Sequence, residues 1–397
     1  MRMSGTALVA LAATAVITIM APSALAGPDQ AARPALANPG DVAPSLSLSV
    51  TASGQPEAAT VGNGGSLWFY HQVSGHWSRT RIGGTAAVAS GPSLTIGSGG
   101  AVSIAVQGPG HTLQYYFRTN GHWRHTQAGG RNTTYAAPSV AIGPHGPGIA
   151  AQGRNHTLWY YALSNGHWHG AEINGPGTAY SAPSMVIRSS TQADPANPAG
   201  QVDIAVQNGS HTLSYYNSLP SGHWQNDVIG TLNSTYSAPS LLVFHGDISR
   251  SRDVGVAYVV AQGPNHSLMT YADASGWTRT TILGSGWVYS APSLTQGGAA
   301  RPIGIAYRGP SSSVAFIYLS RSGRGWVNDV ISAAVGQVSS APSLFLRFTN
   351  PPAENDLIFQ GTDHTLWYYH APNPVSASQA PAFTGSKIAG LGTTYGG

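Results

Sequence analysis

Apolar and polar residues alternate along short stretches through most of this chain. In the stretch 102–107, Ile104 and Val106 share one side while Gln107 falls on the other, a period of two that is typical of a β-strand. A Gly-Pro-Gly turn signal separates it from a second such stretch at 112–116. Asn120-Gly121 then favours a tight hairpin turn. Together with a recurring Ala-Pro-Ser segment, the pattern predicts about four short antiparallel strands in one unit.

The unit recurs seven times. Ala-Pro-Ser followed by an apolar residue marks each copy, with Gly in place of Ala in the second, at Pro44, Pro92, Pro138, Pro183, Pro239, Pro292 and Pro342. Four-stranded units that repeat about every 50 residues are the signature of propeller blades. The repeats are expected at about 43–90, 91–136, 137–181, 182–237, 238–290, 291–340 and 341–397.

The two ends of the repeat array complement each other. The sequence stops shortly after Tyr395, where a repeat would continue with Ala-Pro-Ser, and that piece occurs at the other end as Ala43-Pro44-Ser45-Leu46. We therefore predict an all-β fold over residues 41–397. It is a seven-bladed β-propeller with four-stranded antiparallel blades, and its ring closes between the N- and C-terminal segments.

The first forty residues have a different composition. Arg2 precedes an apolar run that ends near Met20, and Ala24-Leu25-Ala26 is a small-x-small cleavage site, so residues 1–26 are predicted to be a secretory signal peptide cleaved after Ala26. Residues 27–40, rich in Pro and Ala, are predicted to be a disordered lead-in. The expectation is a secreted protein without membrane insertion.

Composition narrows the function classes. The formal net charge is +4, but only 8% of the residues are charged and the arginines are scattered, so no cationic patch suited to nucleic acid is visible. There is no cysteine, which removes thiol chemistry and cysteine-based metal sites. Gly, Ser, Thr, Asn, Gln, His, Tyr and Trp dominate the polar positions. This favours neutral, hydroxyl-rich ligands, and no cofactor or metal is expected.

A Gln-Gly-x-x-His pair, varied slightly in the fourth repeat, is the strongest candidate constellation. It occurs as Gln107/His111, Gln152/His156, Gln207/His211, Gln262/His266 and Gln360/His364. One interpretation is that each pair ties down a turn through backbone groups. The other is that the pairs bond sugar hydroxyls at a recessed site. The first and sixth repeats lack the pair, so at most five such sites would be intact.

Aromatic residues form the second constellation. A Trp recurs in the hairpin at Trp77, Trp123, Trp168, Trp224, Trp277 and Trp326, where it either packs between sheets or stacks on a pyranose ring. The less regular Trp68, Trp159 and Trp367 are better candidates for sugar stacking, because packing does not demand a Trp at their position in every repeat. Tyrosines before Ala-Pro-Ser are predicted to line clefts between neighbouring blades: Tyr135, Tyr180, Tyr236, Tyr289 and Tyr395.

The number and placement of the acidic residues do not favour a glycoside hydrolase. Glycoside hydrolysis needs two converging carboxylates, and the 14 Asp and Glu residues include repeat-related pairs that should lie a blade apart. The chain has neither a Gly-x-Ser-x-Gly nucleophile motif nor the Asp box of sialidase propellers. No histidine spacing suggests a metal site.

The repeat resembles that of the seven-bladed bacterial propeller lectins of the Photorhabdus fucose-binding type. The resemblance covers residues 41–397 and rests on Val-Gln-Gly-Pro-x-His-Thr-Leu-x-Tyr-Tyr, Gly-His-Trp and Tyr-Ser-Ala-Pro-Ser. It implies binding of fucose and related glycans in shallow clefts between blades. The Arg and Glu that recur in six-bladed fungal fucose lectins do not recur here.

Three hypotheses for function follow. The first is a secreted lectin-like propeller with several weak sites for fucose or related neutral sugars, possible partners being fucosylated or methylated glycans. The second is a protein-interaction scaffold that presents the loops 189–200 and 371–386. The third is a polysaccharide hydrolase or lyase that uses non-repeated acids such as Glu57, Glu172 or Glu354. The sequence leaves the sugar, the number of active sites and the oligomeric state open.

Overall fold

The computed structural model describes residues 46–97, 99–190, 192–193, 198–244, 255–296, 303–319, 325–331, 334, 336–347, 354–372 and 382–395. The predicted signal peptide and lead-in lie outside the described residues. Across the part of the chain that is described, no helix is long and apolar enough to span a membrane.

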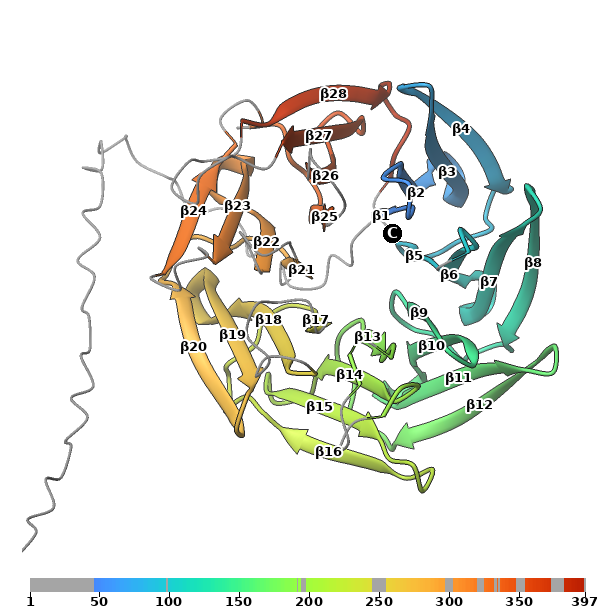
Figure 1. Cartoon of the computed structure of the whole chain (residues 1–397), viewed down its shortest axis with the longest axis vertical. Helices are drawn as coiled ribbons and strands as arrows, with labels where there is room; N and C mark the ends of the chain where they lie inside the picture. Colours follow the sequence, from blue (N-terminus) through green and yellow to red (C-terminus); the bar gives the residue numbers. More distant parts are fainter. Residues whose placement is uncertain are drawn as a thin grey trace, which may run out of the picture. The chain divides into compact units, whose positions relative to one another are not determined.

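Seven sheets of four antiparallel strands form a ring (Figure 1), which confirms the predicted seven-bladed β-propeller. Blade 1 consists of β1 (Leu46–Val50), β2 (Pro56–Gly62), β3 (Ser66–Val73) and β4 (His76–Gly83). Blade 2 consists of β5 (Ser93–Ile96), β6 (Val102–Gly108), β7 (Thr112–Thr119) and β8 (His122–Gly129). Blade 3 consists of β9 (Ser139–Gly143), β10 (Gly146–Gln152), β11 (Leu158–Ser164) and β12 (His167–Asn174). Blade 4 consists of β13 (Ser184–Ile187), β14 (Val202–Gln207), β15 (Leu213–Ser218) and β16 (Trp224–Val228).

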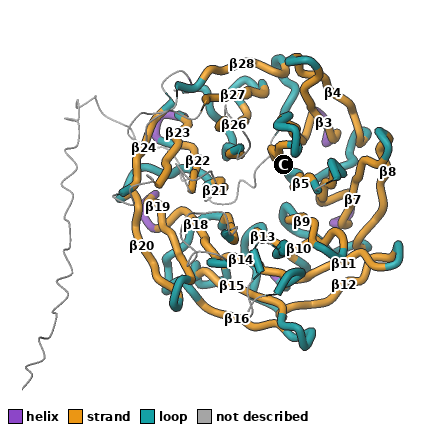
Figure 2. Tube along the Cα trace, viewed as in Figure 1, coloured by secondary structure: helices purple, strands orange, loops and turns teal. Residues whose placement is uncertain are grey.

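The remaining three blades follow the same order. Blade 5 consists of β17 (Ser240–Val243), β18 (Ala257–Gly263), β19 (Ser267–Asp273) and β20 (Trp277–Leu283). Blade 6 consists of β21 (Ser293–Gln296), β22 (Ile303–Arg308), β23 (Val314–Leu319) and β24 (Trp326–Val330). Blade 7 consists of β25 (Ser343–Leu346), β26 (Glu354–Gln360), β27 (Leu366–Pro372) and β28 (Thr384–Ala389). Short 3-10 turns join the second and third strands of five blades (Figure 2): η2 (Asn63–Gly65), η3 (Pro109–His111), η4 (Arg154–His156), η5 (Pro264–His266) and η6 (Pro310–Ser312).

The hairpins between third and fourth strands follow the predicted turn chemistry. Asn120 and Gly121 have φ of 51° and 79°, and Asn165 and Gly166 have φ of 52° and 78°. Two consecutive left-handed residues are what a type I′ turn requires, and Asn-Gly adopts them at least cost. The predicted loop 371–386 is shorter than expected, because Ala371 and Thr384–Ser386 belong to β27 and β28; residues 373–381 lie outside the described part.

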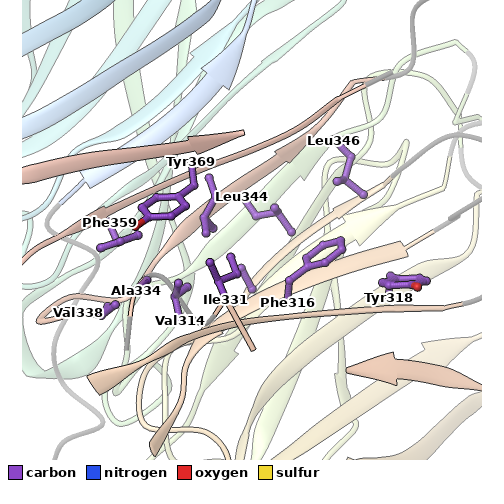
Figure 3. Packing of buried hydrophobic residues seen from close by; sticks show 12 residues of the cluster. Val314, Phe316, Tyr318, Ile331, Ala334, Val338, Leu344, Leu346, Phe359 and Tyr369 are labelled. Carbon is purple, nitrogen blue, oxygen red and sulfur yellow. The ribbon is translucent and has the colours of Figure 1, made fainter. Parts of the chain in front are cut away.

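Apolar side chains are buried between neighbouring blades. In the cluster between blades 6 and 7, Phe316 and Phe359 are fully buried and Leu344 lies beside them (Figure 3). The hairpin Trp takes part in this packing. Trp168 of blade 3 meets Tyr115 of blade 2 edge to face, with centroids 5.0 Å apart, and Trp77, Trp123, Trp224 and Trp277 make the same kind of contact with the preceding blade. These contacts support the packing interpretation of the hairpin Trp.

The first strand of each blade is called the inner strand. A serine near its start links this strand to the next blade. Its Oγ accepts a hydrogen bond of 2.9–3.1 Å from a backbone N–H of the neighbouring inner strand, at Ser47, Ser93, Ser139, Ser184, Ser240, Ser293 and Ser343. The same serines, with Ala and Pro beside them, line a cavity of about 200 Å³ at the centre of the ring.

The ring closes between blades 1 and 7 without sharing a strand. Leu48 donates its backbone N–H to Ser343 Oγ (3.0 Å), and Tyr395 donates its backbone N–H to the Val61 carbonyl (3.0 Å). The predicted position of the closing segment is wrong by two residues. Ser47, not Ser45, takes the place of Ser93, since Ser47 pairs with Ala59 as Ser93 pairs with Ala105. A shift of two residues leaves every side chain on the same face, so the alternating pattern did not reveal it.

Two ion pairs, each with a fully buried aspartate, occupy the same place in blades 4 and 7. Arg188 donates from Nε to Asp203 Oδ2 (2.7 Å), and Tyr215 donates its hydroxyl to the same carboxylate. Arg188 also donates from Nη1 to the Gly255 carbonyl of blade 5 (2.6 Å). In blade 7 the equivalent groups are Arg347, Asp356 and Tyr368. These aspartates, which are repeat-related in the sequence, are therefore buried structural groups.

Candidate functional site

The five Gln–His pairs lie where the second strand of a blade turns into the third. In each pair the glutamine Nε2 contacts the histidine Nδ1 at 2.6–2.9 Å. The same Nε2 donates to a backbone carbonyl in the segment leading to the next blade, at 2.5–2.8 Å. The carbonyls belong to Thr134, Ala179, Thr235, Val288 and Thr394. We call the end of the blades that carries these turns the turn face.

The backbone carbonyl determines how the glutamine amide is oriented. A carbonyl only accepts, so the amide nitrogen and not the amide oxygen must face it, and its second hydrogen goes to the histidine Nδ1. In the third and fifth blades the histidine Nδ1 also lies 3.2 and 3.1 Å from the same carbonyl oxygen. The glutamines are buried and serve the fold, as the turn-stabilising interpretation holds, whereas His111, His156 and His364 are exposed. Ligand contact by any of these residues stays a prediction.

The five histidines adopt left-handed backbone conformations, with φ of 50–60°. This is uncommon for residues other than Gly and Asn, and it orients the ring along the turn. Blade 6 ties its turn differently, since Arg308 donates from Nη2 to Ser312 Oγ (3.2 Å). Blade 1 has Val61 and Gly65 at these positions and so lacks a side-chain tie of this kind.

Each histidine stacks on a tyrosine that precedes the next blade. The ring centroids of the five pairs are 3.9–4.9 Å apart and the rings are within 10–18° of parallel: His111–Tyr135, His156–Tyr180, His211–Tyr236, His266–Tyr289 and His364–Tyr395. The tyrosine also reaches the following blade. The Tyr180 N–H donates to the Gln207 carbonyl (2.7 Å), and its ring lies against Gly209, where an added Cβ would be 2.6 Å from the ring. The predicted tyrosines therefore do lie at the junctions between blades.

The irregular tryptophans lie at the same junctions. Trp159 of blade 3 packs on a cluster shared with blade 2, covers Gly153 and donates from Nε1 to Thr157 Oγ1 (2.9 Å). Trp68 packs between blades 7 and 1, and Trp367 packs between blades 6 and 7. All three are half-buried, so part of each indole meets solvent.

Two junctions combine a tryptophan with a His–Tyr stack. Between blades 2 and 3, Trp159 covers Gly153, and the preceding Gln152 accepts a hydrogen bond from the N–H of Tyr135 (2.8 Å), the partner of His111. The second such junction lies between blades 7 and 1, where Tyr395 donates to blade 1 and Trp68 packs. At the four junctions that follow blades 3 to 6, the residues at the position of Trp159 are Ser214, Met269, Ala315 and Trp367.

The third-strand position of Trp159 faces a residue on the fourth, outer strand of the same blade. The charge of that facing residue differs from blade to blade. Trp68 faces Arg81, Trp159 faces Glu172 and Trp367 faces Lys387. Uncharged residues stand there in the other blades: Gln127, Val228, Thr281 and Val330. The junctions thus share one backbone and differ in chemistry.

Among the described residues, Glu354 and Asp356 lie close together because both pair with the Arg347 guanidinium. Glu354 pairs with Arg347 (2.7 Å), Glu172 is exposed on β12, and Glu57 is buried in blade 1. In the described ranges, no group of three or more His, Asp or Glu side chains is placed to hold a metal ion.

Glu57 is the buried carboxylate with the poorest compensation. It occupies the strand position of Asp203 and Asp356, but Thr51 and Phe69 replace the Arg and Tyr that serve those two aspartates. Arg118 of blade 2 approaches Oε1 only to 3.8 Å, and Oε2 is buried without a hydrogen-bond partner. Burial raises the pKa of Glu57 to about 7, although Arg118 acts in the opposite direction.

Glu57→Gln is expected to remove a pH dependence of stability. The folded-state pKa of about 7 lies above the ordinary value of 4.5, so the unfolding free energy of the parent should fall as pH rises from 4.5 to 7. At pH 8 the variant should be more stable by about 1–2 kcal/mol, after allowance for solvent screening, and at pH 4.5 the two should match. Urea midpoints across this range measure the difference. Glu172→Gln, an exposed control, should shift nothing; parallel curves for parent and Glu57→Gln would contradict the assignment.

Comparison with known proteins establishes the fold. Neither a protein-family model nor a curated protein sequence matches the chain. Among solved structures, the BP39L lectin from Burkholderia pseudomallei aligns with a TM-score of 0.72 at 15% identity, covering 89% of this chain and all of that one. A variant of the Aleuria aurantia lectin in complex with Fucalpha1-6GlcNAc aligns with a TM-score of 0.52 at 13% identity, covering 74% of this chain and 96% of that one. The SapL1 lectin in complex with alpha methyl fucoside gives 0.51 at 13% identity, covering 78% and 98%.

Proposed function

We propose that this protein is a secreted, lectin-like propeller that binds glycans at several similar and individually weak sites. Fucose or a related neutral sugar is the proposed ligand. The observation that carries the proposal is the junction between blades 2 and 3, where half-buried Trp159 covers Gly153 and the preceding Gln152 accepts the N–H of Tyr135, which stacks on His111. An indole face suits the apolar C–H side of a pyranose, and the exposed imidazole and tyrosine hydroxyl suit its oxygens.

Repetition supports the same proposal. Five junctions carry the His–Tyr stack, so several weak contacts on one glycan-bearing surface would raise avidity by about 10²–10⁴ over a single site. The solved structures of similar fold include lectins in complex with fucosides. Glu354 and Asp356 lie close together but share Arg347 as an ion-pair partner, and this neutralised arrangement favours binding over hydrolysis.

Trp159→Ala is expected to weaken fucoside binding at one junction by about 10-fold, because loss of one aromatic plate costs roughly 1–2 kcal/mol. Titration of the ¹⁵N-labelled protein with methyl α-L-fucoside, followed through backbone amide signals at each junction, such as that of Tyr135, measures it site by site. The matched control is Val228→Ala, which removes an exposed apolar side chain from blade 4, at the position of Glu172.

A glycan array probed with folded, multivalently displayed protein tests the proposal as a whole. Binding to fucosylated or methylated glycans that free fucoside displaces is the expected result. A blank array under these conditions would overturn the lectin assignment. Capture of a single protein partner that free sugars do not displace would instead favour an interaction scaffold.

A further inference from the structure

The junction between blades 7 and 1 carries two arginines on one strand. Arg79 and Arg81 both lie on β4, two residues apart and therefore on the same face of the strand. Arg81 is the cross-strand neighbour of Trp68, and Arg79 is the neighbour of Tyr70. Blades 1 and 7 lie side by side in the ring (Figure 1), with β4 and β28 on its outer rim.

Trp68 holds one of these arginines in place. The Arg79 guanidinium carbon lies 4.9 Å from the centroid of the indole, and the indole is fixed in turn because its Nε1 donates to Ser66 Oγ (3.0 Å). A guanidinium stacked on an aromatic face keeps the N–H donors along its edge free for an anion. Trp68 therefore serves here as a support for a cation and not as a bare plate for a sugar ring.

These arginines have no acidic partner among the described residues. Within the described ranges, neither Arg79 nor Arg81 has a carboxylate oxygen within 4 Å, and both side chains are exposed. Blade 7 provides the contrast. Lys387 lies over Trp367 at 5.2 Å, but it is also paired with Asp363 at 3.8 Å. A cation over a tryptophan is thus neutralised in one blade and left available in the next.

We propose that the junction between blades 7 and 1 binds an acidic sugar, one bearing a carboxylate or a sulfate ester, through the guanidinium groups of Arg79 and Arg81. The inference rests on the proposed function, since it assigns a second ligand class to one of the same junctions. Planar guanidinium edges match carboxylate and sulfate oxygens in paired hydrogen bonds. Two guanidinium groups suit one anionic substituent and are too few for a polyanion such as nucleic acid.

The test titrates the ¹⁵N-labelled full chain with methyl β-D-glucuronide, with a 3-O-sulfated methyl galactoside, and with the uncharged methyl glucoside and galactoside. Saturable shifts of the Trp68 indole signal with an anionic probe, and at least 10-fold weaker binding of its uncharged counterpart, are the expected results. The double variant Arg79→Gln/Arg81→Gln should lose at least 10-fold in affinity for the anionic probes and should keep its affinity for methyl α-L-fucoside at the distant junction between blades 2 and 3. Response to the glucuronide alone would identify the group as a carboxylate, and response to the sulfated galactoside alone would identify it as a sulfate.

A charge-matched control separates a site from general attraction. Arg124→Gln/Arg131→Gln removes two exposed arginines from blade 2 and should change affinity for either anionic probe less than twofold. Equal losses in both double variants, or equal binding of charged and uncharged probes, would overturn the acidic-sugar site. Fucoside binding without any response to anionic sugars would overturn this inference and leave the lectin proposal standing. No response to any sugar, on the array or by NMR, would overturn both.

Discussion

Arg188→Leu is expected to lower the free energy of unfolding by about 3–5 kcal/mol, one of the two largest effects that we anticipate in this chain. Arg188 and Asp203 have side chains that are 3% and 0% exposed, so the substitution leaves a carboxylate buried with one hydroxyl donor, that of Tyr215. It also removes the donor to the Gly255 carbonyl, which links blade 4 to blade 5. Urea unfolding followed by tryptophan fluorescence, with the thermal midpoint as a second readout, measures the loss.

The double variant Arg188→Leu/Asp203→Leu is the informative control. Removing both charges removes the buried, uncompensated carboxylate, so most of the lost stability should return. Arg188→Lys should fall between, because a single ammonium cannot reproduce the paired geometry. A cost below 1 kcal/mol for Arg188→Leu alone would show that Asp203 finds another partner.

Phe359→Ala is expected to cost about 3–5 kcal/mol, since it opens a cavity at a fully buried position between blades 6 and 7. Phe359 stacks on Tyr369 with centroids 5.4 Å apart and belongs to the cluster that also holds Phe316 (Figure 3). The same unfolding experiments apply. Leu391→Ala, at a side chain that is 74% exposed, should change stability by less than about 0.5 kcal/mol. Equal effects of the two substitutions would mean that the packing between blades contributes little to stability.

The architecture could be predicted from the sequence because each repeat contains the strand and turn signals of a complete blade. Alternation with a period of two, Asn-Gly hairpins and seven Ala-Pro-Ser segments together specify the number of strands and blades. What the pattern did not contain was the register of the first strand. Ser45 and Ser47 alternate with leucines in the same way, and only the pairing of Ser47 with Ala59 distinguishes them.

The candidate site was predictable in its positions but not in its chemistry. The Gln–His pairs, the tyrosines and the irregular tryptophans do lie at turns and junctions. The sequence left open whether glutamine serves the turn, because the carbonyl that orients its amide, such as that of Thr235 for Gln207, comes from a distant segment. The cation over Trp68 was missed for a related reason. Arg79 is eleven residues from Trp68, and their contact arises only when β3 and β4 pair.

The missed ion pairs had a faint signal. Asp203 and Asp356 stand at the same repeat position, and Arg188 and Arg347 each follow the repeat serine by four residues. The aspartate and the arginine both depart from the usual repeat residues, and they do so in the same two units. Such a coincidence indicates that the aspartate and the arginine of a unit are in contact. The first unit differs, because Glu57 is present at the acid position without an arginine to pair with it. This unpaired acid is the group for which the pH dependence of stability is expected.

Closure of the ring by side-by-side contact has a consequence for how such a chain can change. Every sheet is made of four consecutive strands, and the first and last sheets meet through the hydrogen bonds of Ser343 and Tyr395. No sheet needs a strand from the far end of the polypeptide. A gene segment that encodes one unit therefore encodes one complete sheet, so each copy can acquire its own ligand preference on a common frame while it keeps the contacts to its two neighbours.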